Sequence, residues 1–228
     1  MDVVMRIGIR LLLARAVRAE VETHLGDEAQ AKLLLRRVVR HYDALVDGLA
    51  REPTLGARIM ARLSAVTVAM YRSLRDQGMG HEESRDCTSR INWRVYDKLT
   101  LIPWSLTRLL AKDRLRRVRK AMDIFMRFPY APPGYDMSYV DAGDECVGFD
   151  VRRCPAAELF ERAGLSDLCK SAFCDLDYPL AQNWGVALER SQTLSTGATY
   201  CDFRFRRAVG DSGQLVTLRR GRDQRRVG

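Results

Sequence analysis

Residues 129–152, PYAPPGYDMSYVDAGDECVGFDVR, divide the chain into two parts with different periodicity. The proline-rich segment 129–134 marks a break, because proline and glycine interrupt regular secondary structure. Residues 135–140 and 145–152 then read as two strands, and residues 141–144 (DAGD) as the turn of a hairpin. The second part of the chain is therefore predicted to be built on an antiparallel sheet.

Short helices and a second pair of strands are expected after this hairpin. Pro155 suits a first helical turn, and Gly164 suits a helix stop. The residues around 195–199 (STGAT) read as the turn of the second hairpin. The predicted helices are 155–163, 166–173 and 178–184, and the predicted strands are 186–194, 200–207 and an edge strand at 215–218.

The chain before the break reads as helices, because its apolar residues recur at intervals of three and four. Pro103 fits the first turn of the last of them. The predicted helices are 28–50, 55–74, 82–99 and 104–126. The fold class is therefore α+β, with an N-terminal helical layer packed on a C-terminal antiparallel sheet that carries inserted short helices.

A chain of 228 residues is long enough for one large domain. We expect a single domain over residues 1–209, with a helical part at 1–130 and a sheet part at 135–209. Residues 210–228 are expected to form a basic, partly flexible tail. Met60, Met70 and Trp104 could belong to the core or to a homodimer interface.

The chain is basic, with 38 Lys+Arg against 29 Asp+Glu and a net charge of +9. This excess favours anionic partners such as carboxylates, phosphates or an acidic membrane surface, and we expect an anionic small-molecule substrate. Two runs hold much of the charge, KDRLRRVRK at 112–120 and RRGRDQRR at 219–226. They lack interleaved aromatic residues, and no helix-turn-helix pattern is visible, so we expect no nucleic-acid partner.

Six cysteines are present, without a Cys-x-x-Cys pair. We see no secretory signal, so free thiols in a reducing cytoplasm are the expectation. The segment closest to a targeting signal is 7–17, which Arg10 and Arg15 interrupt. It is too short and too charged to span a bilayer, although it could form an amphipathic surface helix. We therefore expect a cytoplasmic protein with no integral membrane span.

Three cysteines lie at predicted element junctions. Cys154 precedes Pro155 at a helix start, where a helix N-terminus would stabilise a thiolate. Cys174 begins CDLDY, and Cys201 begins CDFRF. The alternatives are that all three are small buried hydrophobic residues or that they form a zinc site, which the missing Cys-x-x-Cys and histidine ligands disfavour.

The charged residues beside these cysteines supply candidate acids, bases and anion ligands. Asp175 and Asp177 could act as general bases, bind a cationic amidine, or serve only as helix caps. On an extended strand Asp202 and Arg204 share one face, where Arg204 could bind a carboxylate or simply pair with the aspartate. The preceding segment adds further candidates for the same region: Trp184, which more often fills a core, Glu189, Arg190 and Thr193.

Other catalytic motifs are missing from the sequence. It contains no G-x-S-x-G elbow, no phosphate-binding loop, no dinucleotide-binding glycine motif and no His-rich metal motif. Histidine is absent from the second half, which disfavours a serine-hydrolase triad. We therefore expect neither a cofactor nor a metal.

Three strings carry a resemblance to a known family: FDVRRCPAAELFERAGL, FCDLDYPLAQNW and ALERSQTLSTGATYCDFRFRR. In order and spacing they are similar to the L-2-amino-thiazoline-4-carboxylic acid hydrolase family. The resemblance is strongest over residues 135–207 and does not cover the tail. The positions that match are Cys154, Glu158, Cys174, Asp175, Asp177, Tyr178, Glu189, Arg190, Thr193, Gly197, Cys201, Asp202, Phe203 and Arg204.

The resemblance implies a cytoplasmic enzyme that adds water to a cyclic amidine and opens a thiazoline ring. The resemblance does not assign the roles, and our own hypothesis is that Cys174 or an aspartate partner activates water or attacks the amidine carbon. Asp177 or Glu189 would then carry the proton. Arg204 or Arg190 would bind a carboxylate. Cys201 and Asp202 complete the candidate catalytic group, while Cys154, Tyr178, Trp184 and Thr193 are candidate substrate-binding residues.

Two other functions remain open. A family member could be repurposed in specialised metabolism as a cyclase, isomerase or lyase acting on a larger apolar substrate. The chain could also be a non-catalytic module that binds a small molecule or a partner. A small polar site around Asp177 and Arg204 would favour the hydrolase, and a deep apolar cavity would favour the second function.

Overall fold

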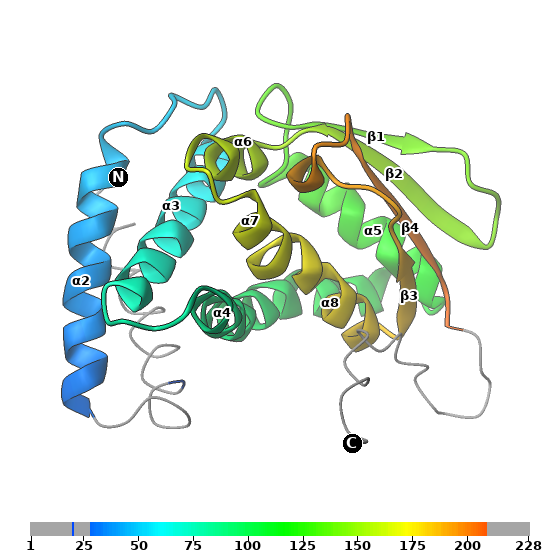
Figure 1. Cartoon of the computed structure of the whole chain (residues 1–228). Helices are drawn as coiled ribbons and strands as arrows, with labels where there is room; N and C mark the ends of the chain where they lie inside the picture. The colour runs from blue at the N-terminus through cyan, green and yellow to red at the C-terminus, as the bar shows by residue number, and fades with distance from the viewer. Residues whose placement is uncertain (1–19, 21–27, 209–228) are drawn as a thin grey trace, which may run out of the picture.

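The structure is a computed structural model that describes Glu20 and residues 28–208 (Figure 1). The predicted surface helix at 7–17, the edge strand at 215–218 and the tail at 210–228 lie outside the described residues. None of the helices in the described part is both long and apolar enough to cross a membrane.

The first part of the chain is helical, as predicted. Its described helices are α2 (Glu28–Val46), α3 (Leu55–Arg75), α4 (His81–Leu110) and α5 (Arg114–Arg127). Thr54 caps α3, because its side chain accepts a hydrogen bond from the Ala57 N–H at 3.2 Å. The facing sides of α2, α3 and α4 bury one apolar core, which includes Leu34, Val38, Leu74 and Ile91.

The predicted boundary at residues 99–104 is wrong, because α4 continues through Pro103 to Leu110. A proline removes one backbone hydrogen bond, yet a helix can continue through it when packing holds the flanking turns. The Thr100 hydroxyl donates to the carbonyls of Tyr96 and Asp97, both at 3.0 Å, in the turn before the proline. The helix ends instead before Asp113, which caps α5 by accepting a hydrogen bond from the Arg116 N–H at 2.9 Å.

The second part contains a four-stranded antiparallel sheet in the order β1-β2-β4-β3. The strands are β1 (Asp136–Val140), β2 (Cys146–Arg153), β3 (Val186–Glu189) and β4 (Cys201–Arg207). The first hairpin is therefore confirmed. Helix α5 packs against β2 and β4, and a second apolar core lies there with Val118, Phe149, Trp184 and Phe205 among its members.

The second hairpin differs from the prediction, because β3 ends at Glu189 rather than at residue 194. The Asp202 carboxylate accepts hydrogen bonds from the backbone N–H groups of Ser191 and Gln192, at 3.0 and 2.8 Å. These amides are thus bonded to a side chain instead of a neighbouring strand. The chain leaves the sheet and forms the short 3-10 helix η2 (Leu194–Thr196), which Gly197 ends with φ +86°.

The predicted short helices connect β2 to β3. They are α6 (Pro155–Arg162), α7 (Ser166–Ala172), the 3-10 turn η1 (Cys174–Leu176) and α8 (Asp177–Asn183). Helices α6 and α7 contribute to the first core, and α8 contributes to the second. Figure 1 shows this connection running between the helical part and the sheet, so the α+β architecture is confirmed and η1 lies where its two parts meet.

Candidate active site

Cys174 begins η1 and is surrounded by hydroxyl and thiol groups. The Thr193 hydroxyl donates to its sulfur at 3.6 Å, and the Ser195 hydroxyl lies 3.5 Å from it. The two hydroxyl oxygens are 3.1 Å apart, and both residues are buried. The early end of β3 therefore brings the 190–200 loop over Cys174, and Thr193 reaches the sulfur from that loop.

This environment lowers the pKa of the Cys174 thiol from 9.0 to about 6. The hydrogen bond from Cys169 contributes most, and the positive charge of Arg190 and the Ser195 hydroxyl add to it, while burial and Asp177 act in the opposite direction. A thiol with such a pKa is largely ionised at neutral pH, and the thiolate is the nucleophilic form of cysteine.

The other cysteines around Cys174 stay protonated. Burial raises the pKa of Cys154 to about 12 and outweighs the hydrogen bonds from the first amides of α6. Burial therefore outweighs the thiolate stabilisation expected at that helix N-terminus. Burial also raises the pKa of Cys201, whose Sγ lies 3.5 Å from the Thr193 hydroxyl. The hydrogen bond to Cys174 and burial raise the pKa of Cys169.

Asp177, the first residue of α8, lies in a buried polar network. The Tyr96 hydroxyl donates to its Oδ1 at 3.0 Å, and Arg190 Nη1 donates to its Oδ2 at 3.1 Å. Arg190 Nη2 also donates to the Cys174 carbonyl at 2.9 Å. The Arg190 side chain is only 3% exposed, so one buried guanidinium connects the carboxylate to the segment that carries the thiol.

Burial raises the pKa of Asp177, although Arg190 and the Tyr96 hydrogen bond partly oppose it. A carboxyl group with a raised pKa can both release and accept a proton closer to neutral pH. Its side chain keeps 20% of its surface exposed, so the group is not sealed from solvent. Burial also raises the pKa values of Tyr96 and Tyr130, which therefore remain hydrogen-bond donors.

Three predicted site residues make contacts away from the Cys174–Asp177 pair. Glu189 is exposed and accepts a hydrogen bond from Arg206 at 2.7 Å, so it does not join this network. Arg204 does not pair with Asp202 but donates to the buried carboxylate of Asp150 at 2.9 Å. Asp202 instead organises the 190–200 loop through Ser191 and Gln192.

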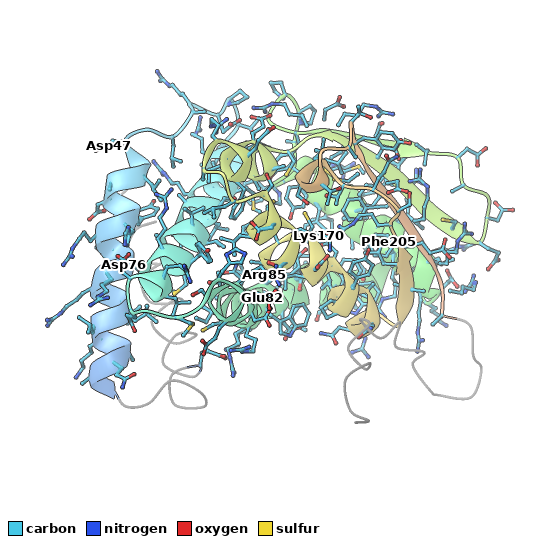
Figure 2. The ribbon with its side chains drawn as sticks, in the orientation of Figure 1. Asp47, Asp76, Glu82, Arg85, Lys170 and Phe205 are labelled. Atoms are coloured by element: carbon cyan, nitrogen blue, oxygen red, sulfur yellow. The ribbon has the colours of Figure 1, made fainter. Side chains whose placement is uncertain are left out.

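Tyr178 and Asp175 lie closer to the network, whereas Trp184 lies in the second apolar core. Trp184 is 4% exposed and stacks on Trp104 with ring centroids 4.8 Å apart, which makes it a core residue. The Arg190 guanidinium lies 5.1 Å from the Tyr178 ring centroid. Asp175 lies 3.8 Å from Arg190 and accepts a hydrogen bond at 3.3 Å from Lys170, which is labelled on α7 in Figure 2.

The candidate site also contains residues that sequence reasoning missed: Tyr96, Tyr130, Cys169 and Ser195. Ser195 lies within the third string that carries the family resemblance, and Cys169 lies between the first two, so their residue types could have been noticed there. Tyr96 lies 81 residues before Asp177, and nothing in its local sequence distinguishes it from a core tyrosine. Among the described residues, no group of three His, Cys, Asp or Glu side chains is arranged to hold a metal ion.

A known family model matches the part of the chain that contains this site. The family model for L-2-amino-thiazoline-4-carboxylic acid hydrolase matches residues 57–205. A search of curated proteins finds no match. The family match includes every residue of the Cys174–Asp177–Arg190 network named above and covers more than half of the chain. The chain therefore belongs to the L-2-amino-thiazoline-4-carboxylic acid hydrolase family.

Proposed function

We propose that the chain is a hydrolase that opens a small cyclic amidine ring, with Cys174 as its nucleophile. The observation that carries this proposal is the thiol of Cys174, whose pKa of about 6 arises beside a buried carboxyl group with a raised pKa. Nucleophilic catalysis by cysteine requires a thiolate with a proton carrier near it. Cys174 and Asp177 supply that pair of groups.

In the proposed reaction the Cys174 thiolate adds to the amidine carbon. The ring C–N bond then breaks, and Asp177 protonates the departing nitrogen. The substrate is left attached to the enzyme through a C–S bond. Water adds to the same carbon and gives a proton to the Asp177 carboxylate, and the bond to Cys174 breaks to regenerate the thiolate. The net change is addition of one water molecule across the ring C–N bond.

The charges around the nucleophile balance when Asp177 carries the proton that the reaction needs. The Cys174 thiolate and Asp175 then face the cations Arg190 and Lys170. The site is therefore close to neutral before a substrate binds. Arg190 and Arg204, the predicted carboxylate ligands, are both in ion pairs, so an anionic substrate group would have to share one of them.

The expected reducing compartment also suits this chemistry. All six cysteines are free thiols. A nucleophilic thiolate of low pKa is readily oxidised, so it needs an environment that keeps thiols reduced. A cytoplasmic location is therefore part of the proposal.

The test is hydrolysis of L-2-amino-thiazoline-4-carboxylate by variants that keep the fold, checked by circular dichroism. We expect Cys174→Ala and Asp177→Asn each to lower kcat/KM at least about a hundredfold. Cys201→Ala is the matched control, because it removes a neighbouring buried thiol whose pKa is raised. Alkylation by iodoacetamide at pH 7, mapped by mass spectrometry, should label Cys174 first. Full activity of Cys174→Ala, or first labelling at Cys201, would reject the assignment.

A further inference from the structure

The second half of α4 presents an exposed apolar face. Leu99, Ile102, Leu106 and Leu109 follow one another at intervals of three and four residues, so they lie along one side of the helix. Their exposed fractions are 47%, 69%, 51% and 86%, and Leu110 beside them is 61% exposed. The side chains of such a stripe are normally buried, but the side chains of this stripe face outward.

The same side of the helix is buried earlier in α4. Thr88 and Ile91 continue the stripe toward the N-terminus, and both are fully buried where α3 and α4 pack. Beyond Leu99 no described element covers the stripe. The exposed fractions of its five residues correspond to roughly 600 Å² of apolar surface. This area is at the upper end of the range for the largest apolar patch on a typical monomeric protein. This face therefore requires a functional explanation.

Positive charges surround this apolar face. Lys98, Arg108 and Lys112 are exposed at its edges, and none of them forms an ion pair with another described residue. The neighbouring Arg117 stacks on Trp104 at 3.8 Å. Burial lowers the pKa of Arg117, and the positive charges of Arg108 and Arg114 lower it further. The end of α4 thus combines apolar side chains with unneutralised cations.

The basic C-terminal segment starts beside the same place. Arg207 is the last residue of β4, and its Nη1 donates to Asp113 at 2.6 Å, in the connection between α4 and α5. Residues 209–228 follow it and contain five arginines against two aspartates. More positive charge is therefore attached to the chain close to the apolar face.

We propose that this face docks on an anionic lipid surface. Apolar side chains that enter the boundary of a bilayer, with lysine and arginine beside the headgroups, are the combination by which an interfacial helix binds. A second copy of the chain fits less well. Antiparallel pairing of two α4 helices about Pro103 would bring Lys98 of one copy beside Arg108 of the other. The patch is also smaller than the ~800 Å² that each partner of a standard interface buries.

The test is sedimentation of the full chain with vesicles of phosphatidylcholine alone or of equal parts phosphatidylcholine and phosphatidylglycerol. We expect binding to the anionic vesicles only, weakened by salt. Ile102→Ser with Leu109→Ser should weaken it about tenfold or more, as should Arg108→Ser with Lys112→Ser. Leu33→Ser is the matched control, because Leu33 is an exposed leucine on α2 with 47% of its surface accessible.

Two other outcomes would overturn the proposal. Absence of binding to anionic vesicles, together with a dimer that Ile102→Ser/Leu109→Ser dissociates in analytical ultracentrifugation, would assign the face to a second copy. A melting temperature that falls more in this variant than in Leu33→Ser, without vesicles, would show that the face is already covered in the free protein.

Discussion

Cys169 and Cys174 lie five residues apart, and one hydrogen bond between them has opposite effects on their thiols. It is the largest influence on both groups, lowering the pKa of Cys174 and raising that of Cys169. Cys169 is 1% exposed and belongs to the first apolar core. It therefore acts as a positioning residue that donates its proton toward the sulfur of Cys174.

This relationship predicts different effects for two substitutions of Cys169. Cys169→Ala removes the donor, so the pKa of Cys174 should rise well above 6 toward its ordinary value. Cys169→Ser keeps a donor of similar size, so the pKa should stay lowered. The measurement is the iodoacetamide alkylation rate of Cys174 between pH 5 and about 10, a range that includes the ordinary cysteine pKa. Identical profiles for the two variants would show that Cys169 only fills space.

At the level of individual residues, part of the candidate site could be predicted from the sequence. The sequence placed Cys174 and Asp177 in one motif and Arg190 and Thr193 in another, and the hydrogen bonds of Arg190 and Thr193 connect the two motifs in the structure. It also favoured Cys154, because a helix N-terminus stabilises a thiolate. Burial outweighs that effect and raises the pKa of Cys154 to about 12. Burial of a single side chain depends on distant elements, so a local motif does not reveal it.

At the scale of elements, the loop between β3 and β4 controls the hydroxyl groups around the nucleophile. Asp202 on β4 accepts three short contacts from this loop, from the N–H of Ser191, the N–H of Gln192 and the Ser191 hydroxyl. Burial acts to raise the pKa of Asp202, but these hydrogen bonds outweigh it and the pKa is lowered. The carboxylate therefore stabilises the folded loop at neutral pH, and the effect is lost on acidification below the ordinary aspartate range.

We expect Asp202→Ala to release this loop. The free energy of unfolding should fall by about 1–3 kcal/mol, since hydrogen bonds to a charged group are lost and two amides lose their partner. Activity should fall as well, because Thr193 and Ser195 lose their fixed positions beside Cys174. Chemical denaturation at pH 7 measures the first effect. Glu189→Ala is the control, because it breaks an exposed ion pair with Arg206 worth less than ~1 kcal/mol. Equal losses in both variants would contradict this account.

The elements themselves were largely predictable from periodicity, and two boundaries were not. Residues 82–99 and 104–126 read as two helices because Pro103 separates them, but the first of these helices continues through the proline to Leu110. The strand predicted at 186–194 stops at Glu189, because Asp202 captures the next amides. In both cases contacts with residues elsewhere in the chain override a local rule.

At the scale of the whole molecule, the candidate site forms only when the helical part and the sheet part come together. Cys174 and Asp177 follow α7, Arg190 and Thr193 follow β3, and Tyr96 comes from the middle of α4. The residues that follow α7 and β3 lie within about 20 positions of one another, so their motifs could be connected from the sequence. The contribution of α4 depends on packing between the two cores, and no short pattern predicts it.

Tyr96 provides the test of that assembly, because its hydroxyl is the contact from α4 to Asp177 at 3.0 Å. Tyr96→Phe keeps the ring in place and removes a hydrogen bond that lowers the pKa of Asp177, so that pKa should rise further. Asp177 acts first as the proton donor, so the basic limb of the kcat/KM profile should move to higher pH, while the melting temperature changes little. Tyr178→Phe is the control, since its hydroxyl donates to the Arg190 carbonyl at 3.4 Å rather than to Asp177. An unchanged basic limb in Tyr96→Phe would mean that Asp177 does not carry the proton.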